Sequence, residues 1–322
     1  MNQTDYAYGV AYIRAIENKL LDKSDMESLI LSKTPDEAMR ILADKGYGSE
    51  PCAPQDFEVL LKAQQEACWE TVREVMPKGA SLDILMYEND FHNIKVMIKA
   101  TFAGVKEYRH LFLEPGTVPT EKIEQAVAEK NFSLLESPFK EAAEQGYALL
   151  ASTEDSQLLD ISLDKAAMDA QMLAAEQSKS DFIKSFVTLK NALADIKIAY
   201  RAQKTEKDKN FLQKALSDHS AFNRDRLIEN ALSNEDALFG YIESCNYGEA
   251  VAALREGMSA FEKYADEKIT AFTEQAKYVV LGVEPLLAYI LKKQAELLSV
   301  RIILSCKING FSEQEIRERL RG

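Results

Sequence analysis

Histidine and acidic side chains are the residues through which this chain could bind a metal ion or transfer protons. One of its three histidines stands in the segment Glu107-Tyr108-Arg109-His110. The Glu-x-x-His spacing supplies metal ligands in helical di-iron proteins, but such a site needs two of these pairs and further carboxylates. Neither His92 nor His219 has a glutamate three residues before it. The sequence therefore predicts no metal site, and Glu107 and His110 are interpreted as a coincidence on the surface.

His92 precedes a motif that the chain repeats, which leaves two interpretations of this residue open. The other two copies of the motif place Ala194 and Leu298 at the corresponding position. A histidine present in one copy of three could mark a specialised site, or it could be a polar residue on a helix surface. The second interpretation is favoured, because few perturbed groups surround it.

Sequence signatures of nucleotide-binding and hydrolytic enzymes are missing. Neither of the glycine patterns that bind phosphate, Gly-x-x-x-x-Gly-Lys-Ser/Thr and Gly-x-Gly-x-x-Gly, occurs in the chain. No serine or cysteine stands between paired glycines, as it would in a nucleophile elbow. The sequence predicts no catalytic residue, no cofactor and no small-molecule substrate. A helical metalloenzyme that uses Glu107 and His110 is the least favoured interpretation.

Charge and composition limit the partners and the compartment of the protein. The 322 residues carry a formal net charge of −13, which opposes binding to nucleic acid and to anionic lipid. The longest apolar stretch, from Tyr278 to Leu291, is interrupted and too short to cross a bilayer. The first residues do not resemble a signal peptide. We expect a soluble cytoplasmic protein with reduced thiols, since the cysteines show no paired spacing: Cys52, Cys68, Cys245 and Cys306.

Helix signals recur through the chain, whereas the alternation typical of strands is scarce. Thr34-Pro35-Asp36-Glu37 places a cap before a proline at the first helical position, and Ser312-Glu313-Gln314-Glu315 opens a last short helix. Ser24-Asp25-Met26-Glu27 is interpreted as a capping box. Residues 162–202 contain neither glycine nor proline, which predicts one or two long helices. The predicted fold class is all-α.

Two short patterns each occur three times with nearly the same period. A tyrosine at a helix-ending turn recurs every 100 residues, and a second pattern recurs at intervals of 102 and 104 residues. The turn tyrosines are Tyr47, Tyr147 and Tyr247, and the second pattern comprises Asn93-Ile94-Lys95-Val96, Asp195-Ile196-Lys197-Ile198 and Ser299-Val300-Arg301-Ile302. Two different patterns that recur at nearly the same interval predict three similar helical domains, at 1–113, 114–208 and 209–322. The charged segment at the second boundary could equally be a solvated helix face.

The second pattern places basic side chains on one side of each helix and aliphatic ones on another. Ile94 and Ile196 are expected to face the core, while lysine or arginine residues stack four residues apart on an outer face. These basic residues are Lys95 and Lys99, Lys197 and Arg201, and Arg301, which has no basic residue four positions on. They could contact an acidic partner, or they could form ordinary salt bridges with neighbouring carboxylates. The second interpretation is favoured, because surface ion pairs are common.

Three segments of the chain resemble one known family. The C-terminal segment is the most specific: Glu284-Pro285-Leu286-Leu287-Ala288-Tyr289, then Lys293, Glu296, Arg301-Ile302-Ile303, Lys307, Gly310 and Ile316-Arg317. The opening helix contributes Tyr8, Ala11, Arg14-Ala15, Glu17 and Leu20-Leu21, and the centre contributes Asp90-Phe91-His92-Asn93-Ile94-Lys95. Together they look like the C-subunit family of archaeal (A-type) and vacuolar-type (V-type) ATPases, whose eukaryotic relatives are the d subunits. The resemblance covers the full length.

The resemblance implies both a shape and a function. In that family, three similar all-helical domains surround a pseudo-threefold axis and form a funnel, the collar of a rotary motor. The implied function is a non-catalytic subunit of the central rotor that links the central stalk to the membrane ring and transmits torque for ATP-coupled H⁺ or Na⁺ transport. The implied partners are the stalk subunits and the ring, bound by a single copy at the cytoplasmic face of the membrane. A free-standing helical adaptor is the alternative.

Overall fold

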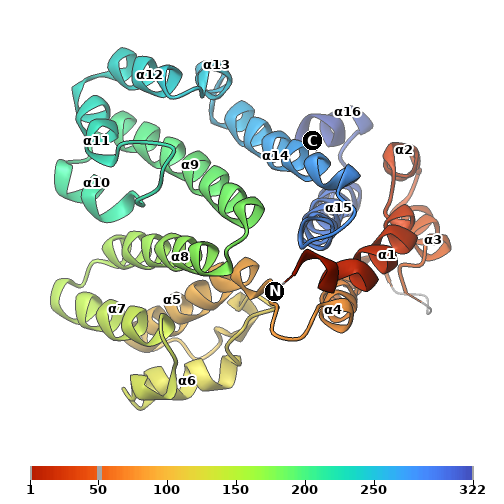
Figure 1. Ribbon diagram of the computed structural model, residues 1–322, viewed down its shortest axis with the longest axis horizontal. Coiled ribbons are helices and arrows are strands. Elements are labelled where there is room, and N and C mark those ends of the chain that lie inside the picture. The colour runs from red at the N-terminus through yellow and green to blue at the C-terminus, as the bar shows by residue number, and fades with distance from the viewer. Residues whose placement is uncertain (1, 49–52, 321–322) are drawn as a thin grey trace. The chain divides into compact units, whose positions relative to one another are not determined.

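Residues 2–48 and 53–320 are described by the structure, a computed structural model of the chain (Figure 1). Every regular element within these residues is a helix: sixteen α-helices are joined by loops and short 3-10 segments, and no strand occurs among them. The predicted all-α class is confirmed. Cys52 lies outside the described residues.

The chain divides into two compact units, which are described separately. Unit 1 combines the two ends of the chain, Met1–Ser81 and Glu256–Gly322, and unit 2 comprises Leu82–Arg255. The three domains with boundaries at 113/114 and 208/209, and the funnel around a pseudo-threefold axis, stay predictions.

Unit 1 is built around α15, a long helix near the C-terminus. Its second half contributes Val300, Ile303 and Leu304 to a core that the N-terminal helices complete, for example with Leu42 and Leu61. Segments from the two ends of the sequence therefore share one apolar core. The α-helices of unit 1 are α1 (Ala7–Ile16), α2 (Lys23–Leu31), α3 (Pro35–Asp44), α4 (Phe57–Val75), α14 (Met258–Glu274), α15 (Glu284–Ile308) and α16 (Glu313–Arg319). Its 3-10 segments are η1 (Gln3–Tyr6), η2 (Glu17–Lys19), η3 (Pro54–Asp56) and η7 (Gln275–Tyr278).

Helix starts in unit 1 follow the capping signals in two of three predicted places. The Thr34 side chain caps α3 with Pro35 at the first helical position, and Ser312 forms a capping box with Glu315 at the start of α16. The prediction that Ser24 caps α2 is wrong. Asp22 caps this helix instead, because its carboxylate lies two residues earlier and accepts the backbone N–H of Asp25 at 2.8 Å.

Unit 2 contains the central helices of the chain. The glycine- and proline-free segment 162–202 forms parts of two long helices, α8 and α9, as predicted. Lys179 separates them with a left-handed backbone, φ 57°. The α-helices are α5 (Tyr87–Ala103), α6 (Thr120–Ala128), α7 (Phe139–Thr153), α8 (Ser156–Ser178), α9 (Asp181–Lys204), α10 (Lys209–Ala215), α11 (Arg224–Ser233), α12 (Glu235–Ser244) and α13 (Gly248–Glu256). The 3-10 segments are η4 (Asp83–Leu85), η5 (Arg109–Leu111) and η6 (Phe132–Leu134).

Three helices, α5, α9 and α15, carry the second repeated pattern and are called the motif helices. Within unit 2, α5 packs against α6, α7 and α8, and α9 packs against α10, α11 and α12 (Figure 1). Within unit 1, α15 packs against α2, α3 and α4. The central aliphatic residue of each pattern is fully buried: Ile94, Ile196 and Val300. The repeated pattern therefore marks the helix around which shorter helices assemble, and its predicted inward face is confirmed.

Two of the three tyrosine turns are present. Gly46 and Asn246 have left-handed backbones, with φ of 88° and 67°, and each ends a helix as predicted. Tyr47 and Tyr247 follow them directly. The Tyr47 ring is buried, with 3% of the residue exposed.

The turn predicted at Tyr147 is wrong, because Tyr147 lies inside α7. Gly146 has a different function here: an added Cβ would stand 3.1–3.4 Å from side chains on α5 and α8. The glycine allows three helices to pack closely rather than supplying a left-handed cap. The turn between α7 and α8 falls later, at Glu154, whose φ is 54°.

Gly9 lets α1 approach α4, and its replacement by alanine is expected to destabilise the protein. An added Cβ would stand 2.7 Å from the backbone oxygen of Val75. The overpacking is expected to outweigh the gain in helix propensity and to lower the free energy of unfolding by about 1–2 kcal/mol. Urea denaturation followed by circular dichroism measures this effect. Gly240→Ala is the control, because no atom lies within 4 Å of its added Cβ; a Gly9→Ala variant as stable as this control would contradict the packing argument.

Candidate functional site

The residues considered for metal binding do not form a ligand cluster in the structure. Glu107 lies in a loop and His110 in η5, so the pair is not displayed on one face of an α-helix. Within residues 2–48 and 53–320, no group of three or more His, Cys, Asp or Glu side chains is arranged to hold a metal ion. His92 is half-buried, and its Nε2 lies 3.0 Å from the backbone oxygen of Leu111.

The polar groups that converge inside the protein lie on the motif helices, and α5 gives the first example. The buried Asp90 carboxylate accepts hydrogen bonds from Thr117 N at 2.9 Å, from Thr117 Oγ1 at 2.6 Å and from Val118 N at 3.0 Å. Burial raises the pKa of Asp90, and these donors oppose the rise. Asn93 Nδ2 donates to the Leu113 oxygen at 2.9 Å, and Leu113 N donates to Asn93 Oδ1 at 2.8 Å. Both side chains thereby attach the loop after α5 to that helix.

The second motif helix, α9, uses Asp195 in the same way. Asp195 Oδ1 accepts from Ser217 N at 3.2 Å, and Oδ2 lies 3.0 Å from both Ser217 Oγ and His219 Nε2. Ala221 N donates to His219 Nδ1 at 3.2 Å, so Nε2 is the ring atom that donates to Asp195. Burial raises the pKa of Asp195, against the effect of the His219 hydrogen bond. Ser217 donates to the carboxylate and not to the imidazole, which is not the order of a nucleophilic triad.

The third motif helix, α15, carries a buried ion pair. Lys293 Nζ lies 2.6 Å from Glu296 Oε1 and 3.3 Å from the Tyr47 hydroxyl, which also donates to Glu296. Glu296 Oε2 accepts the backbone N–H of Leu21 at 2.5 Å. The ammonium stands 4.4 Å from the centre of the Tyr47 ring, within the range of a cation–π contact. Burial, followed by the Glu296 carboxylate, raises the pKa of Tyr47. This cluster connects α15 to two N-terminal segments.

These clusters, called the buried anchors, share one design. In each, a carboxylate or amide on the inner face of a motif helix forms hydrogen bonds with backbone or hydroxyl groups of another segment. That segment lacks a regular hydrogen-bonding pattern of its own, so these groups need partners from elsewhere. Asn93, Asp195 and Glu296 belong to motifs recognised in the sequence, but no role for them followed from those motifs. One sequence signal could have indicated these anchors: each is a polar residue on a helix face that is otherwise apolar. Burying such a side chain without a hydrogen-bond partner costs free energy, so a partner is expected.

The basic residues of the repeated pattern on α5 are half-buried and have acidic neighbours on α8. Lys95 Nζ lies 2.7 Å from Asp164 Oδ1, and Lys99 Nζ lies 2.6 Å from Asp160 Oδ1. The acidic pair is spaced four residues apart on α8, like the basic pair on α5. The two helices therefore face each other through a ladder of opposite charges.

The remaining basic residues are distributed over both units. Arg301 in unit 1 binds Glu58 with its guanidinium, Nε lying 2.9 Å from Oε1 and Nη2 3.1 Å from Oε2. Lys197 and Arg201 lie on α9 in unit 2, Lys197 half-buried and Arg201 exposed, and both interact with other groups of the chain. The structure brings Lys95 and Lys99 together on one helix and Lys197 and Arg201 on another.

The ladder between α5 and α8 is expected to contribute little to stability. A double-mutant cycle with Lys99→Met and Asp160→Asn is expected to give a coupling of about 0.5 kcal/mol, because both side chains are partly exposed to water. Denaturant unfolding of the four proteins at low and high salt measures the coupling, which should decrease at high salt. A coupling above about 2 kcal/mol that resists salt would show a structural role larger than an exposed ion pair can have.

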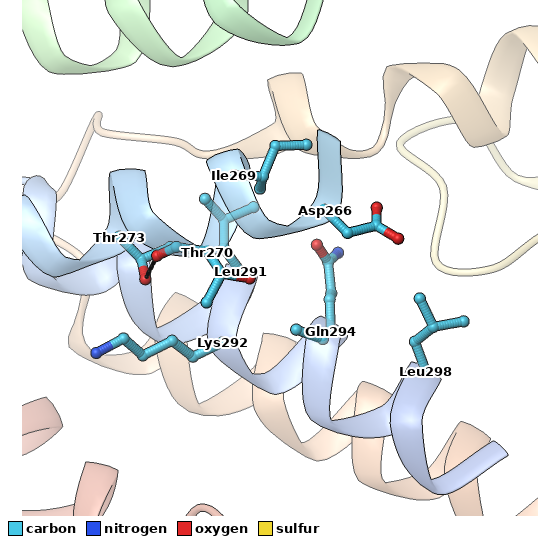
Figure 2. A pocket seen from close by; sticks show the side chains of 9 residues that line it. Asp266, Ile269, Thr270, Thr273, Leu291, Lys292, Gln294 and Leu298 are labelled. Atoms are coloured by element: carbon cyan, nitrogen blue, oxygen red, sulfur yellow. Dashed lines mark hydrogen bonds between the residues drawn. The ribbon is translucent and has the colours of Figure 1, made fainter. Parts of the chain in front are cut away.

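A small groove runs between α14 and α15 in unit 1, with a volume of ≈ 180 Å³. Apolar side chains of both helices line it, including Ile269, Leu291 and Leu298 (Figure 2). Figure 2 shows the charged ends of Asp266 and Lys292 directed toward opposite ends of the groove. Because its charged groups do not converge, the groove offers apolar contact and no arrangement for acid–base chemistry.

Comparison with known proteins gives matches over nearly the whole chain. A family model described as ATP synthase (C/AC39) subunit matches residues 10–319. The C subunit of the V-type sodium ATPase of Enterococcus hirae is 21% identical over 317 residues, which cover 96% of this chain and 96% of that protein. The C subunit of the A-type ATP synthase of Methanocaldococcus jannaschii is 24% identical, covering 98% of this chain and 86% of that protein. The corresponding protein of Pyrococcus horikoshii is also 24% identical, with 98% and 90% covered.

The matched region contains all three motif helices and every buried anchor, which excludes a relationship through one domain alone. The family resemblance seen in the sequence is confirmed. The chain belongs to the ATP synthase (C/AC39) subunit family, whose members include the C subunits of V-type and A-type ATPases.

Proposed function

We propose that this protein is the collar subunit of the central rotor in a V/A-type rotary ATPase. It links the central stalk of the soluble head to the membrane ring of ion-carrying subunits and transmits torque between them. It has no catalytic residue, cofactor or small-molecule substrate of its own. The observation that carries this proposal is the family match from residue 10 to residue 319, which includes nearly all of the chain.

The buried anchors support a mechanical function. A body that transmits torque must resist deformation, and loops fixed by several hydrogen bonds deform less than loops held by apolar contact alone. Asp90, Asp195 and Glu296 each fix a segment outside the helix to a motif helix. The anchors thereby join helices and loops within each unit into stiffer bodies.

The proposed location is the cytoplasmic face of the membrane, with one copy of the chain bound to the stalk subunits and the ring. None of the helices within the described residues is long and apolar enough to span a bilayer. Association with the membrane would therefore depend on the ring. The net charge of −13 opposes direct adhesion to anionic lipid and binding to nucleic acid.

The basic residues of the repeated pattern are proposed partner contacts: Lys95, Lys99, Lys197, Arg201 and Arg301. Lys95, Lys99 and Arg301 have carboxylate partners within the chain. Carboxylates of an acidic partner protein would replace these internal carboxylates or bind the same basic side chains beside them. Replacing the five residues by glutamate is expected to weaken assembly with the ATPase. Unchanged assembly of a folded variant would exclude them as contacts.

Affinity purification of the tagged chain from gently solubilised source membranes tests the proposed function. Recovery together with head, stalk and ring subunits and with ATPase activity is the expected result. A free-standing helical adaptor is the second candidate, since a shared fold does not fix a function. Recovery of the chain alone, with all ATPase activity in the unbound fraction, would favour the adaptor.

A further inference from the structure

The buried anchors stiffen each of the two units separately. The chain passes from one unit to the other twice, between Ser81 and Leu82 and between Arg255 and Glu256. Each anchor joins a motif helix to a segment of the same unit. The two connections between the units therefore depend on their own backbone conformation, which determines how freely they bend.

The first connection, residues 76–82, joins α4 to η4 and contains a tight turn. Ala80 N donates to the Pro77 oxygen at 3.0 Å, and Gly79 inside the turn has a φ of 83°. A turn that needs a positive φ at its third residue favours glycine, because other residues are strained there. Gly79 is exposed, and the unit boundary follows two residues later.

The second connection is a single residue, Gly257, between the end of α13 at Glu256 and the start of α14 at Met258. Its φ of 134° and ψ of 172° fall in a backbone region that is essentially restricted to glycine. No atom lies within 4 Å of a Cβ added there, so packing does not account for the glycine. Two torsion angles of one residue therefore set the direction in which the chain leaves α13.

A short turn with a positive φ does not by itself make a hinge, as the connection between α8 and α9 shows. Lys179 has a φ of 57°, but the helices on either side of it belong to unit 2 and pack against each other. Gly79 and Gly257 differ from Lys179 because each lies within two residues of a boundary between the units. Hinges are typically a few residues at the ends of elements that absorb changes of φ and ψ.

We propose that Gly79 and Gly257 form a two-point hinge about which the two anchored units rotate relative to each other. The inference deepens the proposed function, on which its mechanical meaning rests. A rotor subunit made of two stiff bodies joined by such a hinge stores part of the transmitted torque elastically. The bending itself is a property of the chain alone and is measured without any partner.

Distance distributions between pairs of spin labels test the hinge in the full chain. The labels are attached to genetically encoded ketone side chains, so that the native cysteines stay in place. Exposed helical positions carry them: Tyr8 and Val59 in unit 1, and Leu173 and Leu232 in unit 2. The Val59–Leu173 distribution is expected to be about twofold wider than the Tyr8–Val59 and Leu173–Leu232 distributions. A cross-unit distribution as narrow as those within the units would overturn the proposal.

Glycine variants test whether the bending occurs at these two residues. Gly79→Ala/Gly257→Ala is expected to shift and narrow the Val59–Leu173 distribution and to leave both distributions within the units unchanged, because alanine does not adopt these torsions without strain. Gly240→Ala is the matched control: its added Cβ also meets no atom within 4 Å, but Gly240 lies inside α12. A double variant that behaves like this control would overturn the assignment of the hinge.

Insertion of a second glycine after Gly257 provides a variant that introduces no strain, in case the alanine variant does not fold. It should widen the Val59–Leu173 distribution, and an unchanged distribution would overturn the hinge at this residue. These results do not depend on the ATPase. A chain that bends as expected but fails to rebind to the ATPase complex from source cells lacking it would contradict the proposed function and leave the hinge standing.

Discussion

Replacing Glu296 by glutamine is expected to lower the free energy of unfolding by about 3–5 kcal/mol, the cost of leaving a buried charge without its partner. Lys293 is 8% exposed and has the Glu296 carboxylate 2.6 Å away as its counter-charge. The substitution keeps the shape of the side chain but removes the charge. Urea denaturation followed by the fluorescence of Trp69, the only tryptophan and buried in unit 1, measures the loss.

Two further variants separate the charge from other effects of the Glu296 substitution. Lys293→Met/Glu296→Gln removes both charges and is expected to recover about 1–2 kcal/mol, since no uncompensated charge remains. Glu58→Gln breaks the exposed pair with Arg301 and is expected to cost less than about 1 kcal/mol. A double variant as unstable as Glu296→Gln would contradict the view that the unpaired ammonium causes the loss.

The second large effect is expected at Asp90, whose replacement by alanine should cost about 3 kcal/mol of unfolding free energy. The backbone N–H groups of Thr117 and Val118 and the Thr117 hydroxyl would lose their shared acceptor, and each unsatisfied buried group is costly. Gly116 adds a local constraint, because its Cβ position lies 2.5 Å from Asp90 Oδ1 and admits no side chain. Denaturant unfolding followed by circular dichroism measures the stability.

Hydrogen exchange locates the Asp90 effect. The amides of Thr117 and Val118 should lose protection in Asp90→Ala, while amides in the middle of α8 change only through the global loss of stability. Thr117→Val removes the hydroxyl alone and should cost about 1 kcal/mol. An Asp90→Ala variant no less stable than Thr117→Val would show that the carboxylate does not organise the loop.

Periodic features of the fold were predictable from the sequence, because they depend on local physics. The motif helices were found through their repeated pattern, and the buried positions of Ile94 and Ile196 followed from helical spacing. The helix-ending turns predicted at Tyr47 and Tyr247 are present, with left-handed backbones at Gly46 and Asn246. Gly146 was misassigned, because a glycine selected for close helix packing has the same appearance in a sequence as one selected for a turn.

The buried anchors were not predictable, because each depends on a tertiary contact with a segment outside the motif helix, either the connection that follows it or a segment far away in the chain. Glu296 meets Leu21 and Tyr47, more than two hundred residues away, and Asp90 meets a loop that has no pattern of its own. The helical period shows that these acidic residues lie on an inner face. It does not identify the hydrogen-bond donors that compensate for burying their carboxylates. The basic residues illustrate the same limit, since the partners of Lys95 and Lys99 lie on another helix.

ATP-driven ion pumping tests the collar function most directly. Membrane vesicles from source cells that lack this chain are assayed for ATP hydrolysis and for the ion gradient, before and after addition of the purified protein. The collar function predicts hydrolysis by the head with no gradient in its absence, and a restored gradient when the wild-type chain is added. A full ion gradient in vesicles without the chain would contradict the collar function. A gradient that stays absent after a folded chain has rebound to the vesicles would contradict it as well.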